Sequence, residues 1–403
     1  MADNPRVGAR LRRSPDVRTV SRPVRPGSKR TFDLAYVREG VRGGTPLLII
    51  PGGPGMASVL PYRRARKAAA ARGFDVIMVE HRGVGLSRLD RDGADLPMEA
   101  MTVGEVVEDL AAVLDDCGAR DAVVWGTSYG GYLAQAFGAR YGRRVRGMVL
   151  DSTSSGATDA AKARDHVRRL LWEGVEPATA GVAGRLRALV ASGAVPVEDT
   201  GVVVPVVYEF GGAEAVDRLV TAVADGRRRT WDRVKRLATR EITTPIPFVM
   251  EFDLAGAIWY RELEDIRPDG EPLDTAVGFA HAAEDYPVFE GPPFDLAAEQ
   301  RKFTWPTAVL SGAYDLRAVR PLAEEIVERL PDGVLVPFDR LGHSTLDRHP
   351  FAGLVASGAV AHGRHHDLPR YVERIEEARK PVSGHALGIL LRASLIQDRI
   401  LPV

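Results

Sequence analysis

Residues 122–131 read AVVWGTSYGG and place a serine between an apolar run and a helix-like stretch at 132–140. The apolar run predicts a buried strand. A sharp turn from strand to helix would hold Ser128 in strained backbone geometry, with its hydroxyl projecting above a sheet. Gly126 and Gly130 would let strand and helix approach without side-chain clashes. Gly-x-Ser-x-Gly alone is a weak signal, but in this setting it marks Ser128 as the candidate nucleophile.

Similar units lie on both sides of this turn. They are TPLLII (45–50) running into PGGPG (51–55), FDVIMV (74–79) running into EHRGVG, and then VRGMVL (145–150), TAVL (307–310) and VLVP (334–337). Continuous hydrophobicity is typical of parallel strands covered on both faces. The helix-like stretch 103–116 opens with Thr102 and Glu105, a capping-box pattern. Alternating strands and helices predict an α/β fold with a parallel sheet.

One long segment interrupts this rhythm. The stretch between Asp151 and Trp305 far exceeds the about 2–6 residues of an ordinary α/β link, and its pattern is mainly helical. We therefore expect a helical cap at 155–303, inserted between body segments 31–154 and 304–403. The arginine-rich residues 1–30 predict a basic arm or an edge strand. Helices are expected in the cap at 160–173, 182–191, 213–224 and 232–241, and the C-terminal extension is expected to hold a surface helix at 369–378 and an apolar tail at 386–396.

Charge and composition argue against several classes of partner. The 403 residues include 54 Lys+Arg and 54 Asp+Glu, a balance that gives no reason to expect nucleic acid or an anionic membrane. No apolar run approaches the ~18–20 residues that span a bilayer, and no signal-peptide pattern precedes the body. The single cysteine, Cys117, permits no internal disulfide and fits a reducing, cytoplasmic compartment. His362, His365, His366 and Asp367 are interpreted as solvated loop, so no metal site is expected.

A serine nucleophile needs a base that is held by an acid. In strand–turn–helix hydrolases the chain order is Ser, then Asp or Glu, then His. Asp315 follows the strand at 307–310 and His343 follows the strand at 334–337, so both fall where open α/β sheets build their sites. Asp339 and His349 are alternatives for acid and base, and each lies farther from the position that the strand ends dictate.

An oxyanion hole needs two backbone N–H groups aimed at the developing charge. One should come from Tyr129, the residue after the nucleophile. The other should come from the PGGPG turn, with Gly53 as first candidate and Gly52 as second.

Three strings resemble those of the proline iminopeptidase (prolyl aminopeptidase) family and its tripeptidyl-aminopeptidase relatives: PGGPG at 51–55, EHRGVGLS at 80–87 and GTSYGG at 126–131. GHSTLD around His343 looks like the same group. The resemblance implies an α/β-hydrolase fold, with a mostly parallel eight-stranded sheet flanked by helices and an inserted cap. It also implies release of an N-terminal residue from a small peptide or amide without metal or organic cofactor. Pro51 and Glu80 depart from the family's usual histidine and aspartate.

Family members bind the substrate's free amine with glutamates of the cap. The resemblance therefore implies amine-binding roles for Glu262, Glu264 and Glu251, with Glu209 as a further candidate. Trp259, an aromatic residue of the cap, is a separate candidate for the wall of the substrate pocket. Two other functions stay open. The first is an esterase, lactonase or thioesterase acting on a small metabolite, and the second is a catalytically silent protein that holds a ligand in the same pocket.

Overall fold

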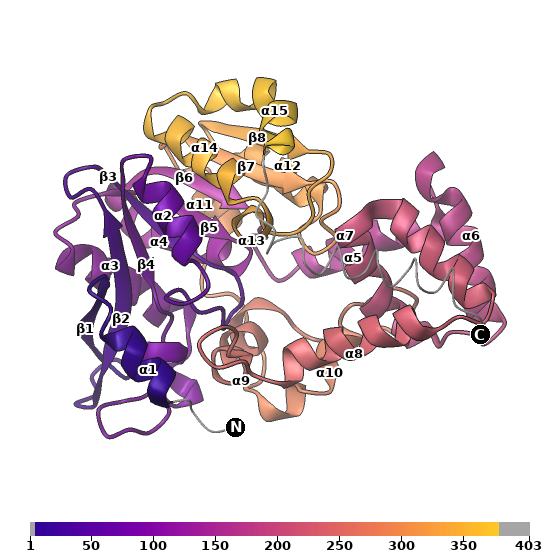
Figure 1. The fold of residues 1–403 in the computed structure, drawn as a ribbon, viewed down its shortest axis with the longest axis horizontal. Coiled ribbons are helices and arrows are strands. Elements are labelled where there is room, and N and C mark those ends of the chain that lie inside the picture. Colours follow the sequence, from indigo (N-terminus) through magenta and orange to yellow (C-terminus); the bar gives the residue numbers. More distant parts are fainter. Residues whose placement is uncertain (1–4, 379–403) are drawn as a thin grey trace.

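The computed structural model describes residues 5–378 of the chain, and Figure 1 shows the fold. The apolar tail predicted at 386–396 lies outside the described residues. Residues 365–377, where a surface helix was expected from 369 onward, form a 3₁₀ turn, η7 (His365–Tyr371), followed by α15 (Val372–Glu377).

One eight-stranded sheet forms the centre of the molecule, with the order β1-β2-β4-β3-β5-β6-β7-β8. β2 pairs antiparallel with both β1 and β4, and every other neighbouring pair is parallel. The predicted fold class, α/β with a mostly parallel sheet, is therefore confirmed. The strands are β1 (Val17–Pro23), β2 (Thr31–Gly40), β3 (Thr45–Ile50), β4 (Phe74–Val79), β5 (Ala122–Thr127), β6 (Val145–Asp151), β7 (Thr307–Gly312) and β8 (Gly333–Phe338).

The central strands are buried on both faces, which explains their unbroken hydrophobicity. Along β3, Leu48 packs into the core on one face of the sheet, while Leu47 and Ile49 pack into the core on the other. β5 alternates in the same way, with Val124 on the first side and Trp125 on the second. A strand that contributes to two cores has no solvent-facing side on which polar residues would be favoured.

Helices of the body cover these two faces. Helix α3 begins as its capping pattern predicted, since the Thr102 hydroxyl accepts a hydrogen bond from the Glu105 backbone N–H at 3.2 Å. The body helices are α1 (Pro5–Arg12), α2 (Arg63–Ala70), α3 (Val103–Asp116), α4 (Tyr129–Tyr141), α11 (Leu296–Gln300), α12 (Arg320–Arg329), α13 (Thr345–Arg348) and α14 (Pro350–Ala361), with short 3₁₀ turns η1 (Gly85–Ser87), η2 (Met98–Ala100) and η3 (Gly142–Arg144).

The segment between β6 and β7 is helical and extends to one side of the sheet (Figure 1). Many of its apolar side chains form a separate core cluster that includes Val203, Val207, Leu219 and Trp231. Besides α11, which packs on the body, its elements are α5 (Asp159–Arg168), η4 (Arg169–Glu173), α6 (Pro177–Ala191), α7 (Val197–Ala224), α8 (Arg229–Thr243), α9 (Phe252–Ala255), η5 (Trp259–Leu263), α10 (Val277–Ala280) and η6 (Ala283–Asp285).

Helix α7 begins well before the predicted helix at 213–224. Its first half is rich in valine, which favours strands in isolation, yet it packs as helix against α6 and α8. The backbone breaks at Gly212, where φ is 63° and ψ is −162°. Tertiary packing therefore overrides local propensity in this helix. Within residues 5–378 there is no helix with the length and apolar character that crossing a bilayer requires.

Candidate active site

The turn between β5 and α4 carries Ser128 in a backbone conformation that few residues adopt, with φ 55° and ψ −122°. Such a conformation costs about 1–3 kcal/mol and persists only where the surroundings enforce it. Here the Ser128 N–H donates to the Asp151 carbonyl at 2.8 Å. A Cβ on Gly126 would lie 2.1 Å from the Gly130 carbonyl oxygen, and a Cβ on Gly130 would lie 2.1 Å from that of Ile50. Both glycines are thus required by close backbone approach.

Three side chains that are far apart in sequence meet above this turn. The His343 Nε2 lies 2.9 Å from the Ser128 Oγ. The His343 Nδ1 lies 3.0 Å and 3.1 Å from the two carboxylate oxygens of Asp315. Because a carboxylate only accepts, the imidazole carries its proton on Nδ1 and offers Nε2 as acceptor to the serine hydroxyl.

The charges of this trio support each other. Burial alone would raise the pKa of Asp315. His343 and the backbone N–H groups of Ala318 and Arg317 lower it by more than burial raises it, so the net shift is downward. Burial lowers the pKa of His343, but the Asp315 carboxylate raises it, and the net shift is upward. Asp315 is therefore an ionised group able to stabilise an imidazolium at His343.

The two alternatives for acid and base lie elsewhere. The Asp339 side chain is 82% exposed and sits beside Arg320. His349 is fully buried at the start of α14, where its ring stacks near that of Phe351. The structure brings His343 to Ser128 and Asp315 to His343.

Asp151, at the carboxyl end of β6, links the loops that carry the serine and the histidine. Its Oδ2 accepts from the Thr127 hydroxyl at 2.8 Å, from the Thr345 hydroxyl at 2.8 Å and from the Thr345 N–H at 2.9 Å. Thr127 precedes Ser128 and Thr345 follows His343 by two residues, so one buried carboxylate sets their spacing. Asp151 is a functional residue that the motifs did not predict, although its place directly after a predicted strand was a usable signal.

The PGGPG loop runs alongside the serine. A Cβ on Gly52 would lie 3.2 Å from the Ser128 Cβ, and Gly53 has a φ of 119°. Tyr129 begins α4, so its N–H belongs to the unpaired first turn of that helix. Its hydroxyl lies 3.0 Å from the Nε2 of His81, whose pKa burial lowers to about 4.

Glu80, which departs from the usual aspartate, lies fully buried beneath this loop. Its carboxylate accepts from the backbone N–H groups of Ser58, Val59 and Leu86. Burial raises the pKa of Glu80 to about 7, and the nearby Glu251 adds to the rise. Glu80 thus ties the loop after PGGPG to the turn at 85–87.

Arg82 is a structural arginine. It is fully buried and binds both carboxylate oxygens of Asp109 at 2.7 Å and 2.8 Å, as well as the Ala100 carbonyl.

Two of the candidate carboxylates of the inserted segment, Glu251 and Glu209, already form ion pairs with arginines. Glu251 accepts from the backbone of Gly85 and Phe248 and pairs with Arg88 at 3.1 Å. Glu209 pairs with Arg348 and, at 3.3 Å, with Arg317. Each carboxylate fastens the inserted segment to the body. Sequence reasoning had no means of finding these arginines, since each lies far away along the chain.

Of the other two carboxylates, Glu262 is buried and Glu264 is half-buried. Glu262 accepts from the Val103 N–H at 2.6 Å, burial raises its pKa to about 6, and its charge acts on Tyr129 and Tyr132. Burial raises the pKa of Glu264 to about 7. The Trp259 indole N–H, within the same π-helical turn as Glu262, has no hydrogen-bond partner among the described residues.

The segment at 362–367 is not uniformly solvated, contrary to expectation. His365 is only 2% exposed, because the turn η7 directs it toward the body, where it and His366 both contact Asp332. His362 and Asp367 do not join them; Asp367 pairs with Arg364.

Fold and site together define a hydrolase-type α/β protein. The chain belongs to the alpha/beta hydrolase fold family, whose model matches residues 45–332.

Individual relatives are more distant. Over 118 residues the chain is 35% identical to the Azorhizobium caulinodans protein named Putative carbamate hydrolase RutD, a match that covers 29% of this chain and 40% of that protein. Solved structures that it resembles include a proline iminopeptidase of Mycobacterium smegmatis (18% identity, 87% and 98% of the two chains, TM-score 0.48). Another is the esterase RhEst1 of Rhodococcus sp. ECU1013, which is 17% identical over 86% of this chain and 98% of that chain, with a TM-score of 0.46. Likenesses at this level say nothing about the substrate.

Proposed function

We propose that this chain is a serine hydrolase that acts through an acyl-enzyme on Ser128. The observation that carries the proposal is the continuous contact from Ser128 Oγ to His343 Nε2 at 2.9 Å and from His343 Nδ1 to Asp315 at 3.0 Å. A hydroxyl with a base in reach, and a base held by an ionised acid, is the arrangement that makes serine a nucleophile.

The steps follow from this geometry. Ser128 Oγ passes its proton to His343 Nε2 and attacks the substrate's carbonyl carbon. The oxyanion that forms is stabilised by the N–H groups of Tyr129 and Gly53, each donor contributing about 10²–10³-fold in rate. His343 then returns the proton to the leaving group, and water repeats the sequence to release the acyl group from Ser128.

Our proposed substrate is a small peptide or aminoacyl amide with a free amino terminus, from which one residue is released. The motifs at 51–55, 80–87 and 126–131 support an aminopeptidase of the proline iminopeptidase type. The partial relative named as a carbamate hydrolase is compatible with this class, because a carbamate also carries an acyl carbon bonded to nitrogen.

Glu262 is the candidate that best suits the substrate's ammonium group. Arginines already pair with Glu251 and Glu209, whereas the Glu262 carboxylate accepts a hydrogen bond from one backbone N–H, that of Val103. A pKa near 6 leaves Glu262 ionised at neutral pH, and an incoming cation would hold it so. The indole N–H of Trp259, buried without a partner among the described residues, offers a further polar contact.

Labelling by a fluorophosphonate probe tests the nucleophile. We expect the wild-type chain to be labelled at one serine and Ser128→Ala to be inert, with the unrelated serine variant Ser357→Ala labelled normally. A wild-type protein that stays unlabelled at neutral pH would favour the silent ligand-binding alternative.

A substrate panel tests the chemistry. Aminoacyl p-nitroanilides should be hydrolysed, with proline at the amino terminus among the preferred residues, while N-acetylated versions of the same amides should not be. If the enzyme instead turns over acyl esters, lactones or thioesters that lack an amine, the esterase alternative replaces the aminopeptidase proposal and leaves the nucleophile assignment intact.

A further inference from the structure

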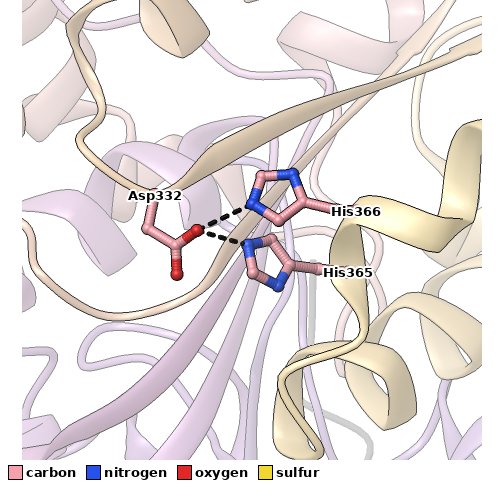
Figure 2. A group of neighbouring side chains, drawn as sticks. All are labelled: Asp332, His365 and His366. Atoms are coloured by element: carbon pink, nitrogen blue, oxygen red, sulfur yellow. Dashed lines mark hydrogen bonds and ion pairs between the residues drawn. The ribbon is translucent and has the colours of Figure 1, made fainter.

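Asp332, His365 and His366 converge at one point on the body (Figure 2). We propose that these three side chains form a binding site for a divalent transition-metal ion of the Zn²⁺ class, and that the ion fastens η7 to the start of β8. The site is independent of the proposed hydrolase activity.

The spacing of the ligand atoms fits such an ion. The Nε2 atoms of His365 and His366 lie 3.0 Å and 2.8 Å from the same oxygen of Asp332, and one ligand atom from each residue falls within 4.8 Å of the others. Zinc–nitrogen and zinc–oxygen bonds of about 2.0–2.1 Å in a tetrahedron place neighbouring ligands roughly 3.3 Å apart. Moving each imidazole away from the Asp332 oxygen by a few tenths of an ångström would therefore give the nitrogen–oxygen spacing that such an ion requires.

The directions of the two imidazoles are unusual for consecutive residues. Side chains of neighbours in a 3₁₀ turn point about 120° apart. Here the two rings stand with centroids 4.1 Å apart, and both reach one carboxylate oxygen. Figure 2 shows the two rings directed at Asp332 from the same side. Such convergence satisfies Asp332, and it also presents two imidazole nitrogens and a carboxylate to a single point.

Two of the three ligands, Asp332 and His365, are held in place, and the third, His366, is exposed to solvent. Asp332 directly precedes β8, and its carbonyl accepts from the Thr307 N–H at 2.9 Å, which anchors it to the start of β7. His365 is 2% exposed and therefore fixed by packing. The His366 side chain is 61% exposed and gives an ion a path from solvent.

No cation competes for the carboxylate within residues 5–378. The ion pairs of Asp332 in this range are those with His365 and His366. The neighbouring Arg364 and Arg370 are instead directed at Asp367. A carboxylate oxygen next to two imidazole rings is a favourable donor set for a dication.

The donor chemistry selects the class of ion. Imidazole with carboxylate suits Zn²⁺, Co²⁺, Ni²⁺ and Cu²⁺, whereas Mg²⁺ and Ca²⁺ prefer sites made of oxygen alone. Asp332 stands at the amino end of β8, but Asp315 and His343 follow the carboxyl ends of β7 and β8. The ion therefore lies at the opposite edge of the sheet from the proposed nucleophile, and its role is to stabilise the fold.

Zinc titration of the full-length, EDTA-treated chain tests the proposal. Isothermal titration calorimetry should show one Zn²⁺ bound per wild-type chain, and Zn²⁺ should raise Tm where Mg²⁺ does not. His366→Ala removes the exposed ligand and should weaken zinc binding at least about tenfold, since losses in the second shell of metal sites alone reach about 10–100-fold. His362→Ala, which removes an exposed histidine outside the cluster, should bind zinc as the wild type does.

Asp332→Asn provides a second variant, because it keeps the shape of the side chain and removes its charge. It should also lose the zinc-dependent rise in Tm, and circular dichroism without metal should show that it is folded. Zinc binding that is equal in the wild type and in both His366→Ala and Asp332→Asn would overturn the proposal, as would a wild-type chain that binds no zinc at 100-micromolar concentration.

Discussion

The three proposed catalytic side chains each follow a strand of one sheet, whereas the candidate carboxylates of the inserted segment lie on helices and turns. The first set meets as the sequence analysis expected, with 2.9 Å between Ser128 Oγ and His343 Nε2. The second set divides. Glu251 and Glu209 form ion pairs with arginines, while Glu262 accepts a hydrogen bond from one backbone N–H.

This difference has a physical cause. Parallel strands in register bring their carboxyl ends to one edge of the sheet, so a residue just past a strand has its place fixed by backbone hydrogen bonds. A charge on a helix surface pairs with any opposite charge that packing brings near. The fold therefore specifies the position of the first kind of residue and leaves that of the second to side-chain packing.

Replacing Asp315, the proposed acid of the catalytic site, should have the largest effect on activity. Asp315→Asn keeps the size of the side chain but favours the wrong tautomer of His343, and we expect kcat to fall about 10⁴-fold. Steady-state kinetics on the substrate found in the panel measures this loss. Asp339→Asn changes an exposed carboxylate nearby and should leave kcat within about twofold of the wild type. Comparable losses in both variants would contradict the assignment of the acid.

Neutralising Glu262 tests whether the inserted segment contributes to substrate binding at all. Glu262→Gln retains an acceptor for the Val103 N–H and removes the negative charge. For aminoacyl amides we expect kcat/KM to fall about 10–100-fold, mostly through KM, because an ion pair with the substrate amine is lost.

Glu284→Gln, which removes the charge of an exposed glutamate of the inserted segment, is the control for this variant and should leave kcat/KM unchanged. An equal effect of Glu262→Gln on substrates with and without a free amine would show that Glu262 supports the fold instead of binding the amine.

Asp151 sharpens the comparison because it links two strand-end loops without touching the serine hydroxyl. In Asp151→Asn an amide N–H₂ would face donors from Thr127 and Thr345. We expect a loss of about 1–3 kcal/mol in the free energy of unfolding and about a tenfold lower kcat. Urea denaturation and kinetics measure the two effects. Unchanged stability would show that the loops keep their spacing without this carboxylate.

Glu80 lies where the body meets the inserted segment, and its effect should be the smallest. Its pKa is about 7 in the folded protein, against 4.5 ordinarily, so the folded state binds more protons than the unfolded state between these values. Stability from this group is therefore present at low pH and is lost as the pH rises from 4.5 to 7. The lowered pKa of His81 acts in the opposite direction, so the comparison must be made between variants.

Glu80→Gln removes this titration while the rest of the chain is unchanged. Relative to wild type, the variant should gain stability on the order of 1 kcal/mol as the pH rises across this range. Thermal denaturation at pH 5 and pH 7 measures the difference. A constant gap between the two proteins at both pH values would contradict the raised pKa.

The local pattern of hydrophobic residues was sufficient to predict the strands of the body, but it was insufficient to predict the helices of the inserted segment. The apolar runs at 45–50 and 74–79 coincide with β3 and β4, because strands buried on both faces leave a continuous hydrophobic signature. The first half of α7 gave no helical signal, since its valines favour strands and only packing against α6 and α8 makes it helical. Asp332 was missed for a related reason: nothing in the sequence connects it with two histidines more than thirty residues away.

The sequence by itself determined three features. They are the succession of strands and turns that carries the functional residues, the strained serine with its flanking glycines, and the residues that follow β7 and β8. These depend on backbone rules that act over a few residues and on the regular register of a parallel sheet. Only the tertiary structure decided which carboxylates are paired with arginines, that Asp151 joins the loops of Ser128 and His343, and that Asp332 meets His365 and His366. Such contacts depend on side chains from distant segments, whose partners are chosen by packing after the backbone is in place.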